Sequence, residues 1–593
     1  MFFLWGSVAL GLCLWAFFDR PSSFLKLRPA LIGVFVCVMA AFAFSLDPST
    51  SLFPTLQAIV FIFTWLMLRG HPEWMQGKLF WRTLIVLGTV TLVQTLHQII
   101  GGPNSAGLYE TYGFLPSNPS FNGIWMASLS VAFIARALKR KQPATMENIV
   151  EILLGISLAT LVIVNPARTR SAPLALCISL PYVFCVRFPV RKVALYTLLV
   201  AGLAFVCLPF SFLEAHARIS GEHAEPNYRT RIWGVAVQST RDHPLTGYGL
   251  GNFEMGYQKH AFPVKEDFLR FARTTQFAHN EYLNVAAEMG LPAFGLLVFL
   301  IITILRYPTS PNSAIQQPAK AALLTLCSDA FFNPTWHIPF LVYVTLLWSV
   351  CLVGPSETLP PSAPKRSPRT ISFGSLLGIL LVFVSTEGLL VYSAFRSVWA
   401  SNGEWEQILK WNPYDASAWK ARGDQLPISS EAVNAYVHAV TLCPAQPYFH
   451  ESLAFALEHS PHPNDLRQAA EQYQIAFQLA PKRANNALAI GRLFYRQGNY
   501  TGSLVWFDQA RQLEPNYWEA YLWIARSLSK TGHKAQAVRL LRALPLQRAR
   551  FLDYQKGFLK RLRFYRPSGY EELILRYDSR VIEQELQRLV SPK

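Results

Sequence analysis

Long apolar runs separated by short polar segments fill the first two thirds of the chain. A helix needs about 20 apolar residues to cross a bilayer, and somewhat shorter runs are tolerated. Twelve such runs precede residue 396, at 1–18, 30–46, 52–69, 79–100, 122–136, 148–165, 172–187, 192–213, 284–305, 318–331, 338–354 and 371–395. The pattern predicts a polytopic helical membrane protein with about 12 spans. The runs at 122–136, 172–187 and 318–331 are short, which leaves the total open by one or two.

The remainder of the chain is polar, and its apolar positions have the spacing of amphipathic helices. A repeat with a period near 34 residues, the length of a tetratricopeptide repeat, is visible in it. Gly498 and Gly532 are 34 positions apart, and so are Pro481 and Pro515. We therefore predict three or four helix pairs between 402 and about 545, followed by a capping helical segment. The expected fold is all-α, with a membrane domain at 1–396 and a helical repeat domain at 397–593.

Composition agrees with a membrane protein, since 51% of the 593 residues are hydrophobic and only 15% are charged. The net charge of +18 is explained by cytoplasmic loops near anionic lipid, so nucleic acid is not expected as a partner. The eight cysteines show no spacing typical of a disulfide or metal framework. The basic stretch 548–566 is either a solvated helix face or a surface for anionic headgroups or acidic glycan.

Lys and Arg gather in alternate loops, which the positive-inside rule assigns to the cytoplasm. These loops lie near 26–28, 69–78, 136–141, 187–192, 306–320 and 365–369. The loops at 101–121, 165–172, 214–283 and 331–337 then face outward. The run at 1–18 has no basic segment before it and no small-residue cleavage site, so we expect a retained span with an outward N-terminus. Twelve spans place the repeat domain outside as well, in the periplasm of a bacterial inner-membrane protein.

The outward loops carry unusual polar residues at span boundaries, at 112–123 and in three further segments. In the segment 165–175, Arg168 and Arg170 stand almost directly against apolar sequence on both sides. Arginine at membrane depth is unfavourable, and its planar fork suits bidentate phosphate contacts. The alternative is that both side chains only reach back to lipid headgroups.

The second segment, 227–253, begins with N-Y-R-T-R-I-W. If its start is helical, Arg229 and Trp233 share a face while Arg231 points elsewhere. The glycines at 247, 249 and 251 have the spacing G-x-G-x-G, which lacks the preceding strand of a nucleotide-binding loop. We interpret them as a tight turn after Pro244.

The third segment, 277–295, places His279 and Asn280 at the entrance of the ninth span, with Tyr282 just inside it. A regular helix would turn Glu288 to the face opposite His279. A lone histidine is more often structural than catalytic, so this segment by itself does not identify His279 as catalytic.

The combination is more specific than its parts. Four motifs follow one another between the membrane spans. They are, in order, an Arg in a short outward loop, R-x-x-x-W, H-P-L-x-G-x-G-x-x-N-F and H-N-x-Y-L-x-x-x-x-E-x-G. This order resembles the superfamily of O-antigen ligases, O-antigen polymerases and pilin-type oligosaccharyltransferases, over roughly residues 80–355. An N-P-x-x-N segment at 118–122 also looks like the family's. The family commonly has S-R-G in the arginine loop, whereas this chain has Thr169, Arg170 and Ser171.

The resemblance implies transfer of a glycan from an undecaprenyl-diphosphate carrier to an acceptor hydroxyl, at the periplasmic face of the inner membrane. Arg170 and Arg229 would stabilise the leaving diphosphate, and His279 would act as the base. Substrate-binding candidates are Arg168, Arg231, Trp233, Asn280 and Tyr282. The carboxylates of the long loop are scattered, so we expect no metal, and no cofactor is implied.

Several activities remain open because they share one site. A ligase would use lipid A core as acceptor, a polymerase of O-antigen or exopolysaccharide would use another lipid-linked glycan, and an oligosaccharyltransferase would use protein. No protein acceptor motif is evident, so ligase or polymerase is favoured. The non-enzymatic alternatives are a transporter of lipid-linked sugar, which should place charges at mid-span in a broken helix, and an assembly scaffold. The repeats would offer a concave face to a periplasmic protein partner, or act as a spacer.

Overall fold

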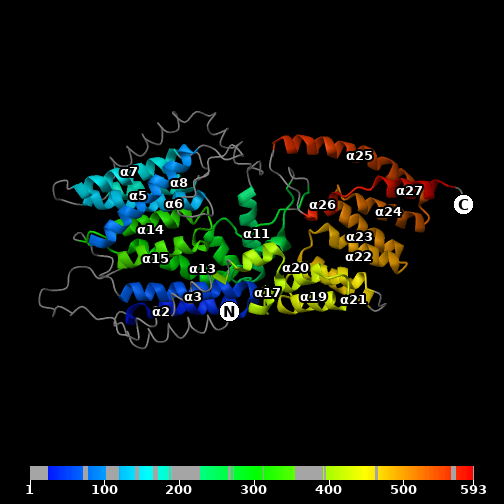
Figure 1. The fold of residues 1–593 in the computed structure, drawn as a ribbon, viewed down its shortest axis with the longest axis horizontal. Coiled ribbons are helices and arrows are strands. Elements are labelled where there is room, and N and C mark those ends of the chain that lie inside the picture. Colours follow the sequence, from blue (N-terminus) through cyan, green and yellow to red (C-terminus); the bar gives the residue numbers. More distant parts are fainter. Residues whose placement is uncertain are drawn as a thin grey trace.

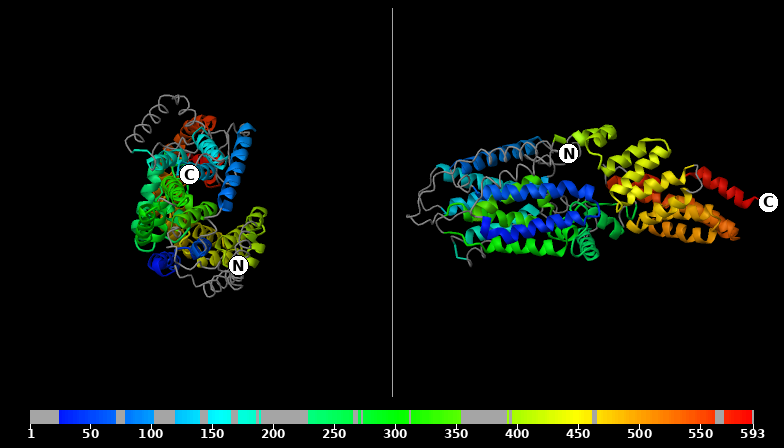
Figure 2. Two further views of the ribbon diagram at one scale, coloured as in Figure 1. Left: turned by 90° about the vertical axis from the view of Figure 1, so that its left-hand side faces the viewer. Right: turned by 90° about the horizontal axis from the view of Figure 1, so that it is seen from below.

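The structure is a computed structural model that describes residues 24–70, 78–101, 119–139, 146–164, 171–185, 188–189, 228–264, 269–271, 273–310, 313–353, 391–392, 395–460, 465–561 and 569–591. All regular elements in these ranges are helices, as expected. They form a helix bundle joined end to end with an array of shorter helices (Figures 1 and 2).

The bundle contains most of the predicted apolar runs. Its elements are α2 (Phe24–Ala43), α3 (Pro48–Gly70), α5 (Lys78–Ile100), α6 (Pro119–Lys139), α7 (Met146–Val164), α8 (Ser171–Cys185), α13 (Glu281–Arg306), α14 (Gln316–Asp329) and α15 (Pro339–Val353). Its main core joins α5, α6, α7, α8, α14 and α15. The helix α6 lies in the middle of this core and packs against α7, α8 and α14.

Small residues bring α6 and α7 close together. A Cβ at Gly155 of α7 would lie 2.9 Å from Ile134 and 3.2 Å from the carbonyl oxygen of Ser130, both on α6. The hydroxyl of Ser130 donates to the carbonyl oxygen of Gly155 over 2.8 Å. Close approach at small residues is the usual way in which helices associate in lipid, where burial of apolar surface gives no advantage.

The outer faces of α5 and α7 are apolar and exposed, as lipid contact requires. Of the described helices, α5, α6, α7 and α13 contain stretches with the length and hydropathy needed to cross a bilayer. This protein is therefore a membrane protein, but the expected total of about 12 spans is not established. The runs predicted at 1–18 and 192–213, and nearly all of 371–395, lie outside the described residues.

Among the described residues between the bundle helices α8 and α13, two further helices precede the start of α13. They are α11 (Tyr228–Asp242) and α12 (Phe253–His260), and a short 3-10 helix, η1 (Thr335–His337), follows α14. The residues 214–283 were expected to form one long loop. A helix was considered there only at the start of α11, so most of α11 and all of α12 were not predicted.

The C-terminal array consists of α17 (Trp405–Trp411), α18 (Ala416–Gln425), α19 (Ser430–Leu442), α20 (Pro447–Glu458), α21 (Asp465–Leu479), α22 (Ala484–Arg496), α23 (Tyr500–Leu513), α24 (Trp518–Lys530), α25 (Lys534–Arg561), α26 (Gly569–Leu575) and α27 (Ser579–Val590). The helices α18 to α25 pack as four successive pairs. The expected three or four pairs are thus present.

The sequence repeats of this array have structural causes. Gly498 and Gly532 have φ of 78° and 89° and end the first helix of their pairs in the left-handed conformation that glycine tolerates. Gly423 and Gly491 are separated by twice the repeat length, and a Cβ at either would collide with an aromatic ring of the second helix, Tyr436 or Phe507.

Candidate functional site

The helix α13 is broken near its beginning. Gly290 has φ 81° and ψ 174°, and Pro292 lies two residues further on. Pro292 has no N–H to donate to the carbonyl oxygen of Glu288, so the helix ladder is interrupted at this point. The span predicted at 284–305 is thus helical, with a break that its apolar pattern does not reveal.

The glycine-rich turn after Pro244 fills the break. The amides of Tyr248 and Gly249 donate to the carbonyl oxygens of Ala287 and Glu288 over 3.0 and 2.9 Å, and the amide of Leu291 donates to Pro244 over 2.8 Å. The backbones approach so closely that a Cβ at Gly247 would lie 2.2 Å from the carbonyl carbon of Glu288. The glycines at 247, 249 and 251 all have positive φ, which agrees with a tight turn.

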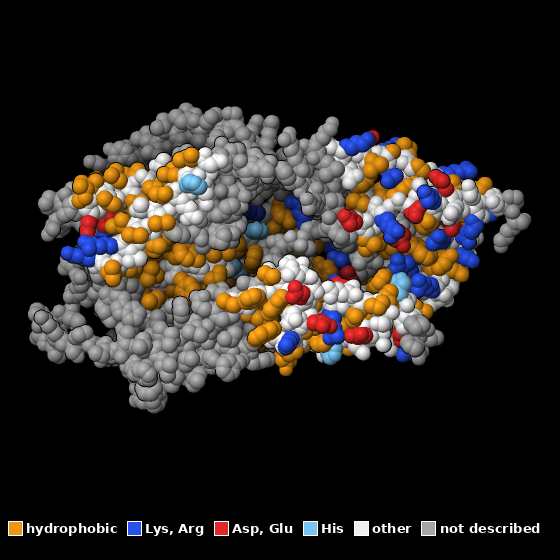
Figure 3. Space-filling model, viewed as in Figure 1, with side chains coloured by type: hydrophobic (Ala, Val, Ile, Leu, Met, Phe, Trp, Pro, Cys, Tyr) orange, Lys and Arg blue, Asp and Glu red, His pale blue; other side chains and the backbone are white. Residues whose placement is uncertain are grey.

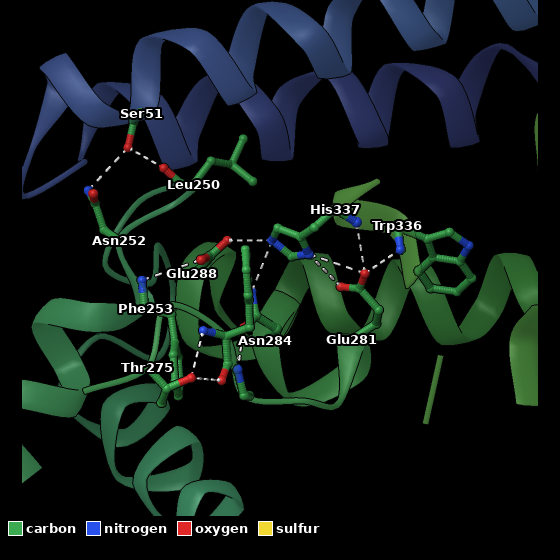
Figure 4. Close-up of polar contacts among 12 residues, drawn as sticks. Ser51, Leu250, Asn252, Phe253, Thr275, Glu281, Asn284, Glu288, Trp336 and His337 are labelled. Carbon is green, nitrogen blue, oxygen red and sulfur yellow. Dashed lines mark hydrogen bonds and ion pairs between the residues drawn. The ribbon is translucent and has the colours of Figure 1, made fainter. Parts of the chain in front are cut away.

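The same turn is anchored on its other side to the connection between α2 and α3. The side-chain amide of Asn252 lies within hydrogen-bonding distance of the hydroxyls of Ser45 and Ser51, at 2.9 and 3.2 Å. Ser51 in turn donates to the carbonyl oxygen of Leu250 over 2.8 Å (Figure 4). The turn therefore holds three bundle helices together at one end.

A second anchor of the turn is Asp242, the last residue of α11. Its carboxylate accepts from the hydroxyl of Tyr248 at 2.7 Å and lies 3.0 Å from Lys259 and 2.6 Å from His260. Partial burial would raise the pKa of Asp242, but these donors outweigh burial and lower it to about 2. The carboxylate stays charged and ties α11, the turn and α12 together.

Two buried carboxylates on α13 enclose His337. Nδ1 of His337 lies 3.0 Å from Glu281, and Nε2 lies 3.8 Å from Glu288, whose side chains are 1% and 2% exposed (Figure 4). Glu281 also accepts from the backbone amides of Trp336 and His337. The amide of Phe253 donates to Glu288 over 3.3 Å. Burial by itself would lower the pKa of His337, but the two carboxylates raise it well above its ordinary value.

His337 and Glu281 were missed by the sequence analysis. Glu281, Asn284 and Glu288 are spaced i, i+3 and i+7, which puts them on one helix face, and this polar face in an apolar span was a readable signal. No local pattern marks His337, because its partners are about 50 positions away in the sequence. The expected opposition of His279 and Glu288 does not apply, because His279 lies before the helix begins.

Arg229 and Trp233 share a face of α11, as expected. Nη1 of Arg229 donates to the carbonyl oxygen of Phe332 over 3.2 Å, and the ring of Trp233 lies 5.8 Å from that of Phe331. Arg231 points elsewhere, with its guanidinium 4.3 Å from the centre of the Phe262 ring. The shared face thus meets the turn that follows α14.

His279, Asn280 and Tyr282 lie at the start of α13, which meets the same turn. His279 is partly exposed and has φ 52°, an uncommon conformation for a residue other than glycine. Asn280 caps α13, since its side chain accepts from the amide of Leu283. The hydroxyl of Tyr282 donates to the carbonyl oxygen of Cys327 over 2.8 Å. The amide of Glu281 donates to Ala330, which fixes the start of α13 to the turn.

Arg168 and Arg170 lie outside the described residues. The next residue, Ser171, is buried at the start of α8 and bonds to the side chain of Asn333. Asn333 also donates to Asp329 over 2.9 Å. The chain directly after the arginine loop therefore reaches the segment 330–337, which also receives Arg229, Trp233 and the start of α13.

Among the described residues, no group of three or more His, Cys, Asp and Glu side chains is arranged to hold a metal ion. The surface is hollowed between the bundle and the repeats, and basic and histidine side chains are visible inside the hollow (Figure 3).

Comparison with known proteins gives two family matches and several solved structures. Residues 153–298 match the O-antigen ligase family, and residues 496–561 match the tetratricopeptide repeat family. No curated protein matches the chain.

Three crystal structures are similar to part of the chain. Two of MamA are 17% and 15% identical and cover 26% and 30% of this chain and 87% and 96% of their own, each with a TM-score of 0.22. The third, of a thermophilic tetratricopeptide repeat protein in Thermus thermophilus, is 20% identical and covers 30% of this chain and 95% of its own, with a TM-score of 0.22.

The expected resemblance is confirmed over these two stretches: residues 153–298 match the O-antigen ligase family model, and residues 496–561 match that of the tetratricopeptide repeat.

Proposed function

We propose that this protein transfers a glycan from an undecaprenyl-diphosphate carrier to an acceptor hydroxyl at the periplasmic face of the bacterial inner membrane. The O-antigen ligase match supports a glycosyltransferase of this type. The observation that carries the proposal is the meeting of Arg229, Trp233 and the start of α13 at the turn 330–332, at one end of the bundle. A lipid-linked donor would present its diphosphate at such a place.

Arg229 and Arg170 are the proposed contacts of the diphosphate. Negative charge grows on this leaving group as its bond to the sugar breaks, and a fixed guanidinium stabilises that charge in the transition state. Arg168 and Arg231 would add positive charge nearby. Trp233 and Tyr282 offer aromatic faces on which a sugar ring could stack, and Asn280 would act indirectly by fixing the first turn of α13.

His279 is the proposed base for the acceptor hydroxyl. It is partly exposed, whereas His337 lies between two carboxylates and keeps its proton. A protonated imidazole cannot accept a proton, which leaves His279 as the better candidate. Its left-handed backbone adds support, because sparsely populated conformations gather at functional sites.

A transporter of lipid-linked sugar is less well supported, although α13 is broken. The groups freed by the break are bonded to the chain's own turn, through Tyr248, Gly249 and Leu291. A transport site would instead leave such backbone groups for the substrate or its coupling ion. Lipid A core is the acceptor we propose, and another lipid-linked glycan is the acceptor of the alternative polymerase.

The proposal is tested with purified lipid-linked donor and the Arg229→Lys variant. Lysine keeps the charge but loses the bidentate fork, so the transfer rate should fall roughly 30- to 1000-fold, equivalent to about 2 to 4 kcal/mol. The matched control is Arg241→Lys at the other end of α11. Wild-type turnover by an Arg229→Lys protein of normal abundance would remove the guanidinium from the mechanism.

The glycan profile of a deletion strain separates the acceptors. Loss of a ligase should leave finished polymer on the carrier lipid, whereas loss of a polymerase should leave capped single repeats.

A further inference from the structure

A short piece of the segment that carries the candidate site is bound by the repeat domain. Leu269 is fully buried in an apolar cluster with Leu488 of α22, Phe507 of α23 and Ile574 of α26. This cluster belongs to the repeats except for Leu269 itself. The chain therefore inserts one of its own side chains between the repeat helices.

A single carboxylate holds the backbone beside Leu269. Glu514, directly after α23, is 1% exposed. Its Oε2 accepts from the amide of Arg270 over 2.9 Å, and its Oε1 accepts from the amide of Phe271 over 3.0 Å. The guanidinium of Arg270 donates to the carbonyl oxygen of Gln512 over 3.0 Å. A buried carboxylate is stable only with such donors, so the two parts of the chain depend on each other here.

The bound piece continues into the candidate site. The guanidinium of Arg273 lies 5.0 Å from the ring centre of Tyr228, the first residue of α11. Further on, the ring of Phe277 lies 4.6 Å from that of His337, and the amide of Ala278 donates to Asn284 over 2.9 Å. The residues held by Glu514 are therefore followed along the chain by residues that contact α11, which carries Arg229, and then by Ala278, the residue before His279.

We propose that Glu514 is a positioning residue for the candidate site, and that the repeat surface around Leu269 binds the chain's own segment 269–271 and not an external partner. By holding the amides of 270 and 271, Glu514 sets where the segment 273–280 meets His337 and presents His279. The role of His279 in this inference rests on the proposed function, whereas the clamp itself can be measured without any transfer.

The test uses the full-length protein and the Glu514→Gln variant, which keeps the shape but loses the negative charge and one acceptor oxygen. The control is Glu471→Gln on α21, where a side chain 61% exposed is 3.9 Å from Arg467. Three quantities are measured: hydrogen exchange of a fragment containing 269–271, modification of His279 by diethyl pyrocarbonate, and the kcat and KM for lipid-linked donor. If Glu514→Gln fails to fold, Leu269→Ala loosens the same contact from the other side.

For Glu514→Gln we expect hydrogen exchange at 270 and 271 to be at least about 10-fold faster. The rate at which diethyl pyrocarbonate modifies His279 should change several-fold. The kcat should fall about 10-fold, with KM within about 2-fold of the wild-type value. Glu471→Gln should match the wild type, and Glu514→Asp should recover part of the loss. Unchanged exchange in Glu514→Gln would overturn the clamp. Faster exchange with unchanged modification of His279 would overturn the positioning role. If the wild type transfers no glycan, the proposed function fails, and exchange and modification still decide this inference.

Discussion

Two histidines lie near the start of α13, and their surroundings give them different chemistry. His337 is held between Glu281 and Glu288, with a side chain 24% exposed. His279 precedes the helix in a left-handed conformation and is partly exposed. The first is therefore suited to hold a fixed positive charge.

His279→Gln should lower glycan transfer about 100-fold or more, because glutamine keeps the size and hydrogen bonding of histidine but takes up no proton near neutral pH. Donor binding should survive, since the arginines remain. The measurement is transfer in vitro, with membrane abundance and thermal stability of the variant determined in parallel. Near wild-type transfer at normal abundance would leave electrostatic stabilisation by Arg170 and Arg229 as the account of catalysis.

His337→Gln should destabilise the protein by about 3 kcal/mol, the order expected when one partner of a buried ion pair is lost. The pKa of His337 is raised in the folded state, so its stabilising effect is complete below the ordinary pKa of about 6.5 and is lost as pH rises through the folded value. Thermal unfolding in detergent should therefore show the largest difference between wild type and variant near pH 6 and a smaller one near pH 9. An equal difference at both pH values would mean that His337 is neutral.

At the scale of elements, the break in α13 and the turn after Pro244 form one structure. The turn supplies the donors that the broken helix lacks, and the break supplies room for the backbone of Gly247. Polar backbone at the end of a membrane helix is tolerated when protein covers it. Glu288 lies next to the break, so the turn also fixes the carboxylate that faces His337.

Gly247→Ala should destabilise the protein by at least about 2 kcal/mol, since the left-handed backbone alone disfavours alanine by about 1 to 2 kcal/mol. The added Cβ would in addition meet the backbone of Glu288 at 2.2 Å. Gly234→Ala is the control, because this helical glycine of α11 has nothing within 4 Å of the new atom and alanine should stabilise the helix by up to about 1 kcal/mol. The measurement is the unfolding temperature of detergent-solubilised protein. Equal temperatures for the two variants would disprove the close backbone contact.

At the scale of the whole molecule, the repeat array and the segment carrying the motifs must lie on the same side of the membrane, because they touch. Besides the Glu514 contacts, Tyr248 and Met255 pack with Cys443 and Phe449 of the repeats. The alternation of basic loops assigns that side to the periplasm. The side remains a prediction, and so do the domain limits at 396 and 397.

A reporter that is active only in the periplasm should be active when fused after Ser401, whereas a reporter that needs the cytoplasm should be silent there. The same pair of reporters fused within the basic loop near 140 should give the reverse result. Cytoplasmic activity after Ser401 would contradict both the orientation and the twelve-span count.

The sequence by itself determined the parts of this protein that depend on local periodicity. Apolar runs predicted the bundle helices, and the 34-residue spacing predicted the paired repeat helices, because neighbours along a helix follow a fixed geometry. The four-residue interval between Arg229 and Trp233 correctly predicted a shared face for the same reason.

Contacts between distant segments were decided only by the tertiary structure. His337 and Glu281 are far apart in the sequence, and so are Glu514 and Arg270, so no local pattern predicts their hydrogen bonds. The break at Gly290 is possible because a turn some 40 residues earlier satisfies its backbone groups. Local sequence fixes which residues share a helix face, whereas packing between elements fixes which buried charge finds a partner and keeps its proton.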